Sequence, residues 1–220
     1  MENGNHPSES VRKHLGIASN CGFLAIIASP VSYTIVAILQ PNYSMWNQSI
    51  SSLGEVGAPF ALYISIMFVI GGFLEVTLAS GLYLALKPNK WALLGSILIA
   101  GTGFFSSSCS GIFPMGAAWT GTIHSLTSTI GVYCMMIAPF VVLIAMRKQR
   151  SWKDLRITTW IVLVLFMVGL GLENVVNFYH TGSGAVQRLE DFTYYFWILC
   201  FAVKFKKVAQ KPPSNIDITI

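Results

Sequence analysis

Residues 60–86 read FALYISIMFVIGGFLEVTLASGLYLAL, and this stretch decides the fold. Glu75 is its one charged residue, and no proline interrupts it. A helix needs about 20 apolar residues to cross the hydrocarbon core of a bilayer, whereas a surface helix of a soluble protein keeps one polar face. The stretch therefore predicts a helix that spans a membrane.

Five further apolar stretches accompany it, so six membrane-spanning helices are expected in all. Pro30 falls inside the first stretch and predicts a kink there. Alternating strands of about ten residues, which are typical of membrane barrels, are absent. The sequence thus predicts an all-α, polytopic membrane protein with six transmembrane helices in one bundle. The expected spans are residues 15–39, 60–86, 91–113, 124–146, 157–179 and 189–205.

The composition favours a membrane protein over a water-soluble one. Of the 220 residues, 54% are hydrophobic and 10% are charged, and the mean hydropathy is +0.61. Soluble domains carry about 25% charged residues. The net charge of +5 would suit a nucleic-acid-binding protein, but the charges are too few to follow a phosphate backbone, so no nucleic-acid partner is expected.

Basic residues are distributed unevenly over the segments that connect the spans. Thirteen of the 14 lysines and arginines fall in the two terminal segments and in the second and fourth connections, and only Arg188 falls on the other side. Because cytoplasmic segments are rich in Lys and Arg, both termini are expected in the cytoplasm. Residues 1–14 and 208–220 are then cytoplasmic tails of a membrane domain over residues 15–207, with membrane lipids as partners.

All four cysteines lie inside the expected spans, which favours packing roles. No cysteine pair falls in a connection, and the spacing matches no zinc motif, so we expect no disulfide, no metal site and no cofactor. One alternative is a site made of His124, His180 and Glu173, since two histidines and a carboxylate can bind iron or zinc.

Glu173 lies in the fifth span, about 9 Å from its end if each of six residues adds about 1.5 Å. Gly169, Asn177 and His180 share its helical face, and Asn174 is beside them. A carboxylate at this depth is costly unless it is protonated, paired or hydrated, so the stripe is expected to face the bundle interior. It is either a functional site open to the outside or a structural hydrogen-bond cluster between helices.

Glu75 is the second intramembrane acid and lies near the middle of its span. Gly71 and Ala79 share its face, which predicts close approach of another helix. We expect Glu75 to be neutral or hydrogen-bonded to that helix. A direct pair with Glu173 is not expected, because the two depths differ by roughly 10 Å on the helical rise.

The first connection on the outer side, residues 40–59, is long and polar. Connections of this length are often functional or partly structured. We expect a short interfacial helix from about Trp46 to Leu53, closed by Gly54 as its C-cap.

Two features at the span ends predict specific contacts. Arg188 and Asp191 are three residues apart at the start of the sixth span and are expected to form an ion pair. His124 opens the fourth span and is expected to bond to a carboxylate or a carbonyl group.

Small residues recur every four positions in the third span, namely Gly103, Ser107 and Gly111. This spacing is typical of tightly packed membrane helices. The third span is therefore expected to pack closely against a neighbour.

Three segments together resemble a prokaryotic membrane family catalogued as domain of unknown function 998. They are Tyr43, Ser44, Trp46, Ser49, Ile50, Ser51, Leu53 and Gly54 in the first connection; Gly111, Ile112, Phe113 and Pro114 followed by His124; and Gln187, Arg188 and Leu189 followed by Trp197. The resemblance covers about residues 15–207. It implies six spans, a polar cluster on the outer side and a location in the prokaryotic cell (inner) membrane, but no reaction.

The chain departs from the family pattern at two places. Ser52 and Met115 stand where the family often has acidic residues, so an activity that depends on those acids would be altered here. A fainter similarity links the chain to Frag1/DRAM/Sfk1-type six-span proteins and is an analogy only.

Three functions are compatible with this pattern. The leading hypothesis is a non-catalytic protein that binds a lipid, a small amphiphile or a partner at an outer polar cluster. The first alternative is a membrane enzyme that acts on a lipid, with Glu173 and His124 in acid–base roles. The second is a small proton-linked transporter that uses Glu75 and Glu173, although no internal repeat supports it. The expected cluster contains His124, Glu173, Asn174, Asn177, His180, Arg188 and Asp191.

Overall fold

The computed structural model describes residues 8–210, and every regular element among them is a helix. In chain order these are α1 (Glu9–Ile26), η1 (Ile27–Val31), α2 (Ser32–Leu39), η2 (Ile50–Gly54), α3 (Ala61–Leu86), α4 (Lys90–Gly101), η3 (Thr102–Ser108), α5 (Cys109–Ile112), α6 (Ala118–Met146), η4 (Arg150–Trp152), α7 (Lys153–Tyr179) and α8 (Ser183–Gln210).

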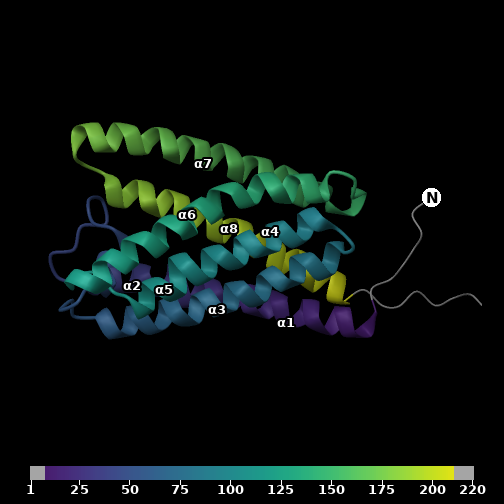
Figure 1. Cartoon of the computed structure of the whole chain (residues 1–220), viewed down its shortest axis with the longest axis horizontal. Coiled ribbons are helices and arrows are strands. Elements are labelled where there is room, and N and C mark those ends of the chain that lie inside the picture. Colours follow the sequence, from purple (N-terminus) through teal and green to yellow (C-terminus); the bar gives the residue numbers. More distant parts are fainter. Residues whose placement is uncertain (1–7, 211–220) are drawn as a thin grey trace, which may run out of the picture.

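These elements form six rods that run back and forth along one long axis (Figure 1). Two rods are composite: α1, η1 and α2 follow one another without a break, as do α4, η3 and α5. We call the end that carries the connections 40–60, 113–117 and 180–182 the loop end. The other end, here the terminal end, carries residues 87–89 and 147–152 together with both ends of the described chain.

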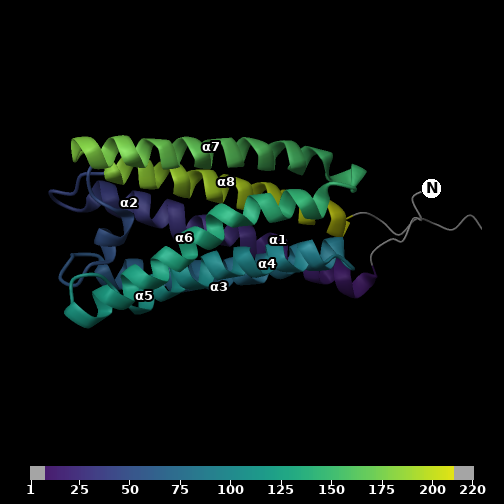
Figure 2. The same cartoon turned by 45° about the horizontal axis from the view of Figure 1, so that its top comes forward.

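The last rod, α8, lies at the centre of the bundle. It packs against α1 and α7, and its fully buried side chains include Trp197, Phe201 and Phe205. On the other side α3 packs on α1 and α4, and α6 packs on α4. The rods α6 and α7 meet near the terminal end and diverge toward the loop end, as Figures 1 and 2 show.

Five rods are long and apolar enough to cross a membrane. They are Glu9–Leu39, Ala61–Leu86, Lys90–Ile112, Ala118–Met146 and Arg150–Tyr179. This confirms the all-helical, polytopic architecture. The sixth rod, α8, has 28 residues, but Glu190 and Asp191 near its start and three lysines near its end leave a shorter uncharged stretch.

Charge is divided between the two ends of the bundle in the way the sequence predicts. The lysines and arginines of residues 8–210 lie at the terminal end, with Arg188 alone at the loop end. Lys211 and most of the expected C-terminal tail lie outside the described residues, as do residues 1–7 of the expected N-terminal tail.

Each composite rod contains a π-helical segment in its middle. Pro30 lies within η1, so the predicted kink coincides with a change of helix type. Proline has no N–H to continue the α-helical hydrogen bonds, which explains the interruption there. The longer segment η3 contains Gly103 and Ser107, two of the small residues expected to pack tightly.

The third rod does pack closely on α3. A Cβ atom on Gly103 would lie 2.7 Å from the Cβ of Glu75, and one on Gly111 would lie 2.3 Å from the carbonyl oxygen of Ser65. From the α3 side, a Cβ on Gly72 would lie 2.2 Å from the carbonyl oxygen of Gly103. These distances leave no room for a side chain and confirm the packing prediction.

Gly72→Ala tests this contact. The new methyl group would meet backbone atoms of η3 that cannot move independently, so we expect a loss of about 1–3 kcal/mol in the free energy of unfolding. Thermal unfolding in detergent measures it. Gly171→Ala is the matched control, because nothing lies within 4 Å of that position in α7 and alanine favours helix by about 1 kcal/mol. Equal stability of the two variants would contradict the packing argument.

Candidate functional site

Glu75 lies in the interior of the bundle and is 0% exposed. Its two oxygens accept hydrogen bonds from the hydroxyl groups of Tyr194 (2.9 Å) and Tyr195 (2.6 Å) on α8, and Ser107 of η3 donates a third bond of 3.4 Å. As expected from the sequence, the carboxyl group is hydrogen-bonded to neighbouring helices. These three donors replace the hydrogen bonds with water that the carboxyl group loses when it is buried.

A second polar contact lies closer to the loop end. Tyr33 of α2 donates a hydrogen bond of 2.5 Å to a carboxylate oxygen of Asp191 on α8. One turn earlier on α8, the side-chain oxygen of Gln187 accepts a bond of 2.7 Å from the backbone N–H of Ile50 in η2. These two contacts tie the start of α8 to α2 and to the first connection.

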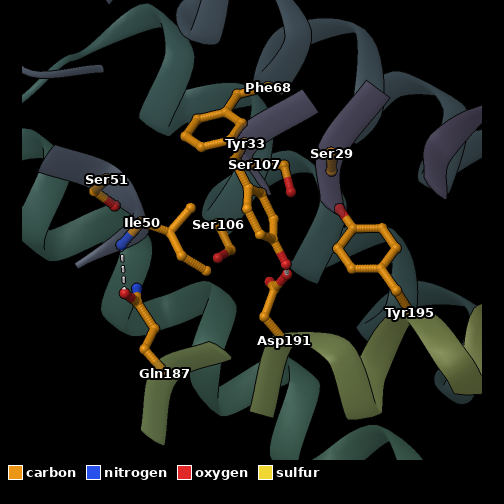
Figure 3. A pocket seen from close by; sticks show the side chains of 10 residues that line it. All are labelled: Ser29, Tyr33, Ile50, Ser51, Phe68, Ser106, Ser107, Gln187, Asp191 and Tyr195. Carbon is orange, nitrogen blue, oxygen red and sulfur yellow. Dashed lines mark hydrogen bonds between the residues drawn. The ribbon is translucent and has the colours of Figure 1, made fainter. Parts of the chain in front are cut away.

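A cavity of about 50 Å³ lies between these contacts and the partners of Glu75 (Figure 3). Tyr33 points at Asp191 on one side of the cavity, and Ser107 and Tyr195 line the side toward Glu75. The hydroxyl oxygen of Ser29 is buried without a hydrogen-bond partner. The lining residues are Ser29, Tyr33, Ile50, Ser51, Phe68, Ser106, Ser107, Gln187, Asp191 and Tyr195.

The cavity lies in the loop-end half of the bundle, and its lining is polar in a protein with an apolar interior. Eight of the ten lining side chains carry a hydroxyl, amide or carboxyl group, and none is a lysine or an arginine. An apolar cavity of this size would stay dry, whereas a polar one holds water or a ligand. It is therefore the best-formed candidate site of the described chain.

Arg188 does not form the expected ion pair with Asp191. Its guanidinium instead donates to the carbonyl oxygens of Met45 (3.0 Å), Gln48 (3.0 Å) and Gly184 (2.9 Å), and to the hydroxyl group of Tyr43. The planar guanidinium offers five donors, which matches this set of acceptors better than a single carboxylate would. The prediction of an Arg188–Asp191 pair is wrong because backbone acceptors of the first connection were not visible in the sequence.

The same contacts correct the expected helix from Trp46 to Leu53. The structure has a shorter 3₁₀ helix, Ile50–Gly54, which Ser49 caps by accepting a bond of 3.3 Å from the N–H of Ser52. Residues 45–48 cannot extend it, because their carbonyl groups bond to Arg188 and to α8.

The other residues of the first connection that match the family pattern make contacts within the loop end. Tyr43 donates to the carbonyl oxygen of Ser49 (2.7 Å), and Gly54 is buried against Ile64. Ser51 lines the cavity. Trp46 is exposed and packs beside Gly182.

Phe113, Pro114 and His124 lie together, away from the cavity. The Nδ1 atom of His124 donates to the carbonyl oxygen of Phe113 at 2.9 Å, and the imidazole is buried. Gly111 allows α5 to touch the backbone of α3, and Pro114 follows in the turn to α6. His124 thus bonds to a carbonyl group, as one of the expected alternatives stated, and does not line the cavity.

The polar stripe of α7 is not buried in the bundle interior, so that expectation is wrong. Glu173, Asn174, Asn177 and His180 are all exposed. The buried face of α7 ends at Gly169, beyond which α6 has diverged and no helix covers it. His180 ends the helix in a left-handed conformation (φ 52°).

This placement separates the expected cluster into two parts. Arg188 and Asp191 join the first connection and the cavity, whereas the stripe with Glu173 lies on the far side of α8, where Glu190 packs against Gly169. Glu173 and His124 lie on diverging helices. Within residues 8–210 no group of three His, Cys, Asp or Glu side chains could hold a metal ion, which leaves the site of His124, His180 and Glu173 without support.

The sequence analysis missed the aromatic members of the site. Tyr33, Tyr194 and Tyr195 stand in apolar runs and look like core residues, although their hydroxyl groups bond to Asp191 and Glu75. The sequence held part of this information, because a buried acid needs hydrogen-bond donors and adjacent tyrosines on another span can supply them. Ser29 and Gln187 had no comparable signal.

Comparison with known proteins finds one family. Residues 23–204 match the family described as "Protein of unknown function (DUF998)". Because the match spans most of the 220 residues, the chain belongs to this family. No curated protein and no solved structure matches the chain.

Replacing Arg188 with lysine tests its role at the loop end. A lysine ammonium has three donors and no planar fork, so it cannot hold the four acceptors that Arg188 contacts. Bonds to charged groups contribute about 1.5–3 kcal/mol each, and we expect faster hydrogen exchange of residues 43–52 in Arg188→Lys. Arg156→Lys at the terminal end is the control and should leave that exchange unchanged. Unaltered exchange in Arg188→Lys would refute the role of Arg188 in holding the first connection.

Proposed function

We propose that this member of a family without a known reaction binds an amphiphile that carries an ammonium group, with the ammonium in the cavity and the apolar chain in a groove beside it. We further propose that all six rods span the membrane and that the loop end is the outer side. The site would then be open to the outer leaflet of a prokaryotic cell membrane.

The charge of the cavity supports a cationic head group. Asp191 is the one charged residue that lines it, and the other lining groups are mostly hydroxyl and amide oxygens that can accept hydrogen bonds. Arg188, the one lysine or arginine of residues 8–210 at the loop end, is held by backbone carbonyl groups and not by Asp191. Asp191 is half-buried and accepts its hydrogen bond from the neutral hydroxyl group of Tyr33, so a cation in the cavity would supply the opposite charge that a partly desolvated carboxylate favours.

The size of the cavity supports a small head. Each water-sized site needs roughly 10–15 Å³, so about 50 Å³ holds roughly three to five of them. An ammonium group with its first carbon atoms fits this space. The unpartnered hydroxyl of Ser29 is a further group that such a ligand would satisfy.

One observation carries the amphiphile in particular: Tyr195 lines both the polar cavity and an apolar groove on the outside of the bundle. The groove measures about 440 Å³ and lies between the first rod and α8, so an alkyl chain could follow it. Its other lining residues are Ile26, Pro30, Val31, Thr34, Ile35, Phe192, Phe196 and Leu199. A polar cavity and an apolar groove that share one wall match a ligand with a polar head and an apolar tail.

No observation favours the lipid-modifying enzyme. That hypothesis needs His124 and Glu173 to converge on a reacting group. They lie on helices that diverge, and His124 is engaged by a carbonyl group.

The binding proposal is tested with dodecylamine against dodecanol, which has the same chain but no charge. We expect dodecylamine to raise the melting temperature of the detergent-solubilised protein, and Asp191→Asn to weaken its binding about tenfold or more, since a charged hydrogen bond contributes about 1.5–3 kcal/mol. Glu173→Gln is the matched control, because it removes an exposed carboxylate at the same end. Equal binding of the two ligands, or a loss in Glu173→Gln alone, would refute the proposal.

The source of the amine can be identified in the same protein. Native mass spectrometry of the wild type in vesicles of phosphatidylethanolamine and phosphatidylglycerol should retain the former selectively if the natural ligand is a lipid. Retention of neither lipid, with dodecylamine still bound, would assign a free amine.

The proposed orientation is tested with single cysteines in a variant without the four native ones. Val56 is 57% exposed at the loop end, and Lys148 is exposed at the terminal end. A membrane-impermeant thiol reagent added to intact cells should label Val56→Cys and not Lys148→Cys, because the basic terminal end is expected in the cytoplasm. The reverse labelling would invert the topology.

A further inference from the structure

The cavity also gives the loop end access to Glu75, which the proposed amine binding does not use. We infer that Glu75 is a proton-binding site that exchanges its proton with the loop end only. This inference does not depend on whether an amine binds.

The access route runs through two hydroxyl groups. Ser107 and Tyr195 both line the cavity, and both donate to the Oε1 atom of Glu75, at 3.4 Å and 2.6 Å. Glu75 is therefore one hydroxyl group away from any water in the cavity. Hydroxyl groups can relay a proton because each is both a donor and an acceptor.

The proton transfer needs no other reactant. A hydronium ion in the cavity gives a proton to the hydroxyl oxygen of Ser107 while Ser107 passes its own proton to Oε1 of Glu75. Two O–H bonds break and two form, a water molecule remains in the cavity, and the carboxylate becomes a neutral carboxyl group. Release follows the same steps in reverse.

The opposite side of Glu75 is closed by apolar side chains. One turn toward the terminal end on α3 come Leu78 and then Leu82, and α8 contributes Trp197, Phe201 and Phe205. All five are 0% exposed and belong to one packed cluster. Among residues 8–210 the hydroxyl contacts of Glu75 on this side run through Tyr194 to Thr102, which donates to the carbonyl oxygen of Leu98, and end there. A proton on Glu75 therefore has no continuous hydroxyl route to the terminal end.

Few other titratable groups face Glu75. Tyr194 and Tyr195 contact it from α8, and Asp191 lies one turn away on the same helix. Ser107 of η3 bonds to Glu75, while Ser29 of the first rod lies beside Tyr195 and Thr102 of η3 beside Tyr194, and none of the three carries a charge. Among residues 8–210 no lysine, arginine or histidine bonds to Glu75, so protonation is the available means of neutralising it.

Proton binding changes the hydrogen bonds around the site. A neutral carboxyl group carries one donor, so one of the three hydroxyl groups must turn to accept from it, and in the relay this group is Ser107. Ser107 also lines the cavity. The site thus links the proton concentration at the loop end to the hydrogen bonds that line the cavity.

Infrared difference spectroscopy tests the inference on the full-length protein in sealed vesicles, with no amine added. Lowering the pH on the loop-end side should produce a protonated-carboxyl band that is lost in Glu75→Gln and kept in the matched variant Glu173→Gln. A band that follows only the pH on the terminal-end side, or no band at all, would overturn the inference. Because no amine is present, this outcome is independent of the Asp191→Asn binding test.

A second variant covers the case in which Glu75→Gln does not fold. Tyr195→Phe removes the 2.6 Å bond and should shift the frequency of the band without abolishing it. An unshifted band would assign the signal to another carboxyl group and refute the role of Glu75.

Thiol labelling tests the sidedness separately, again in a variant without native cysteines. A small, charged thiol reagent should reach Ser107→Cys from the loop end, in whose half of the bundle the cavity lies, and should not reach Leu78→Cys from either end. Labelling of Leu78→Cys, or failure to label Ser107→Cys in a folded protein, would contradict a route that is open on one side only.

Discussion

The interior of this bundle is organised around one buried carboxyl group. Glu75 needs hydrogen-bond donors in a place that has no bulk water, and it finds them on two other rods. To bring those donors within reach, α3 and η3 approach so closely that only glycine fits at Gly72 and Gly103. The adjacent tyrosines of α8 occupy the remaining side, which fixes α8 at the centre of the fold.

The loop end depends on a second charge, which is satisfied in a different way. Arg188 bonds to backbone carbonyl groups of the first connection and therefore holds residues 45–48 over the start of α8. Because its donors are used there, Asp191 is left to Tyr33 and to the cavity. The separation of these two charges, three residues apart on one helix, is what gives the cavity its acidic character.

How far the sequence could predict this structure depends on the kind of information needed. The lengths of the apolar stretches predicted the rods, and the small residues around Gly103 predicted the close contact with α3. Helical periodicity also gave the face of α7 on which Glu173 lies, but it could not tell that α6 diverges and leaves that face uncovered. The acceptors of Arg188 are backbone atoms, which any sequence would supply, so no residue pattern could identify them.

The order of residues along α8 explains why the two halves of the bundle differ. Its first turns carry Gln187, Arg188 and Asp191 and meet the polar connections, its middle carries the tyrosines that hold Glu75, and its later turns bring buried aromatic rings into the core. Since a polar side chain is tolerated in a membrane only where partners or water satisfy it, the polar half must stay hydrated or filled while the aromatic half can pack dry. Glu75 lies at the boundary between these halves, where a carboxyl group can be reached from one side and sealed from the other.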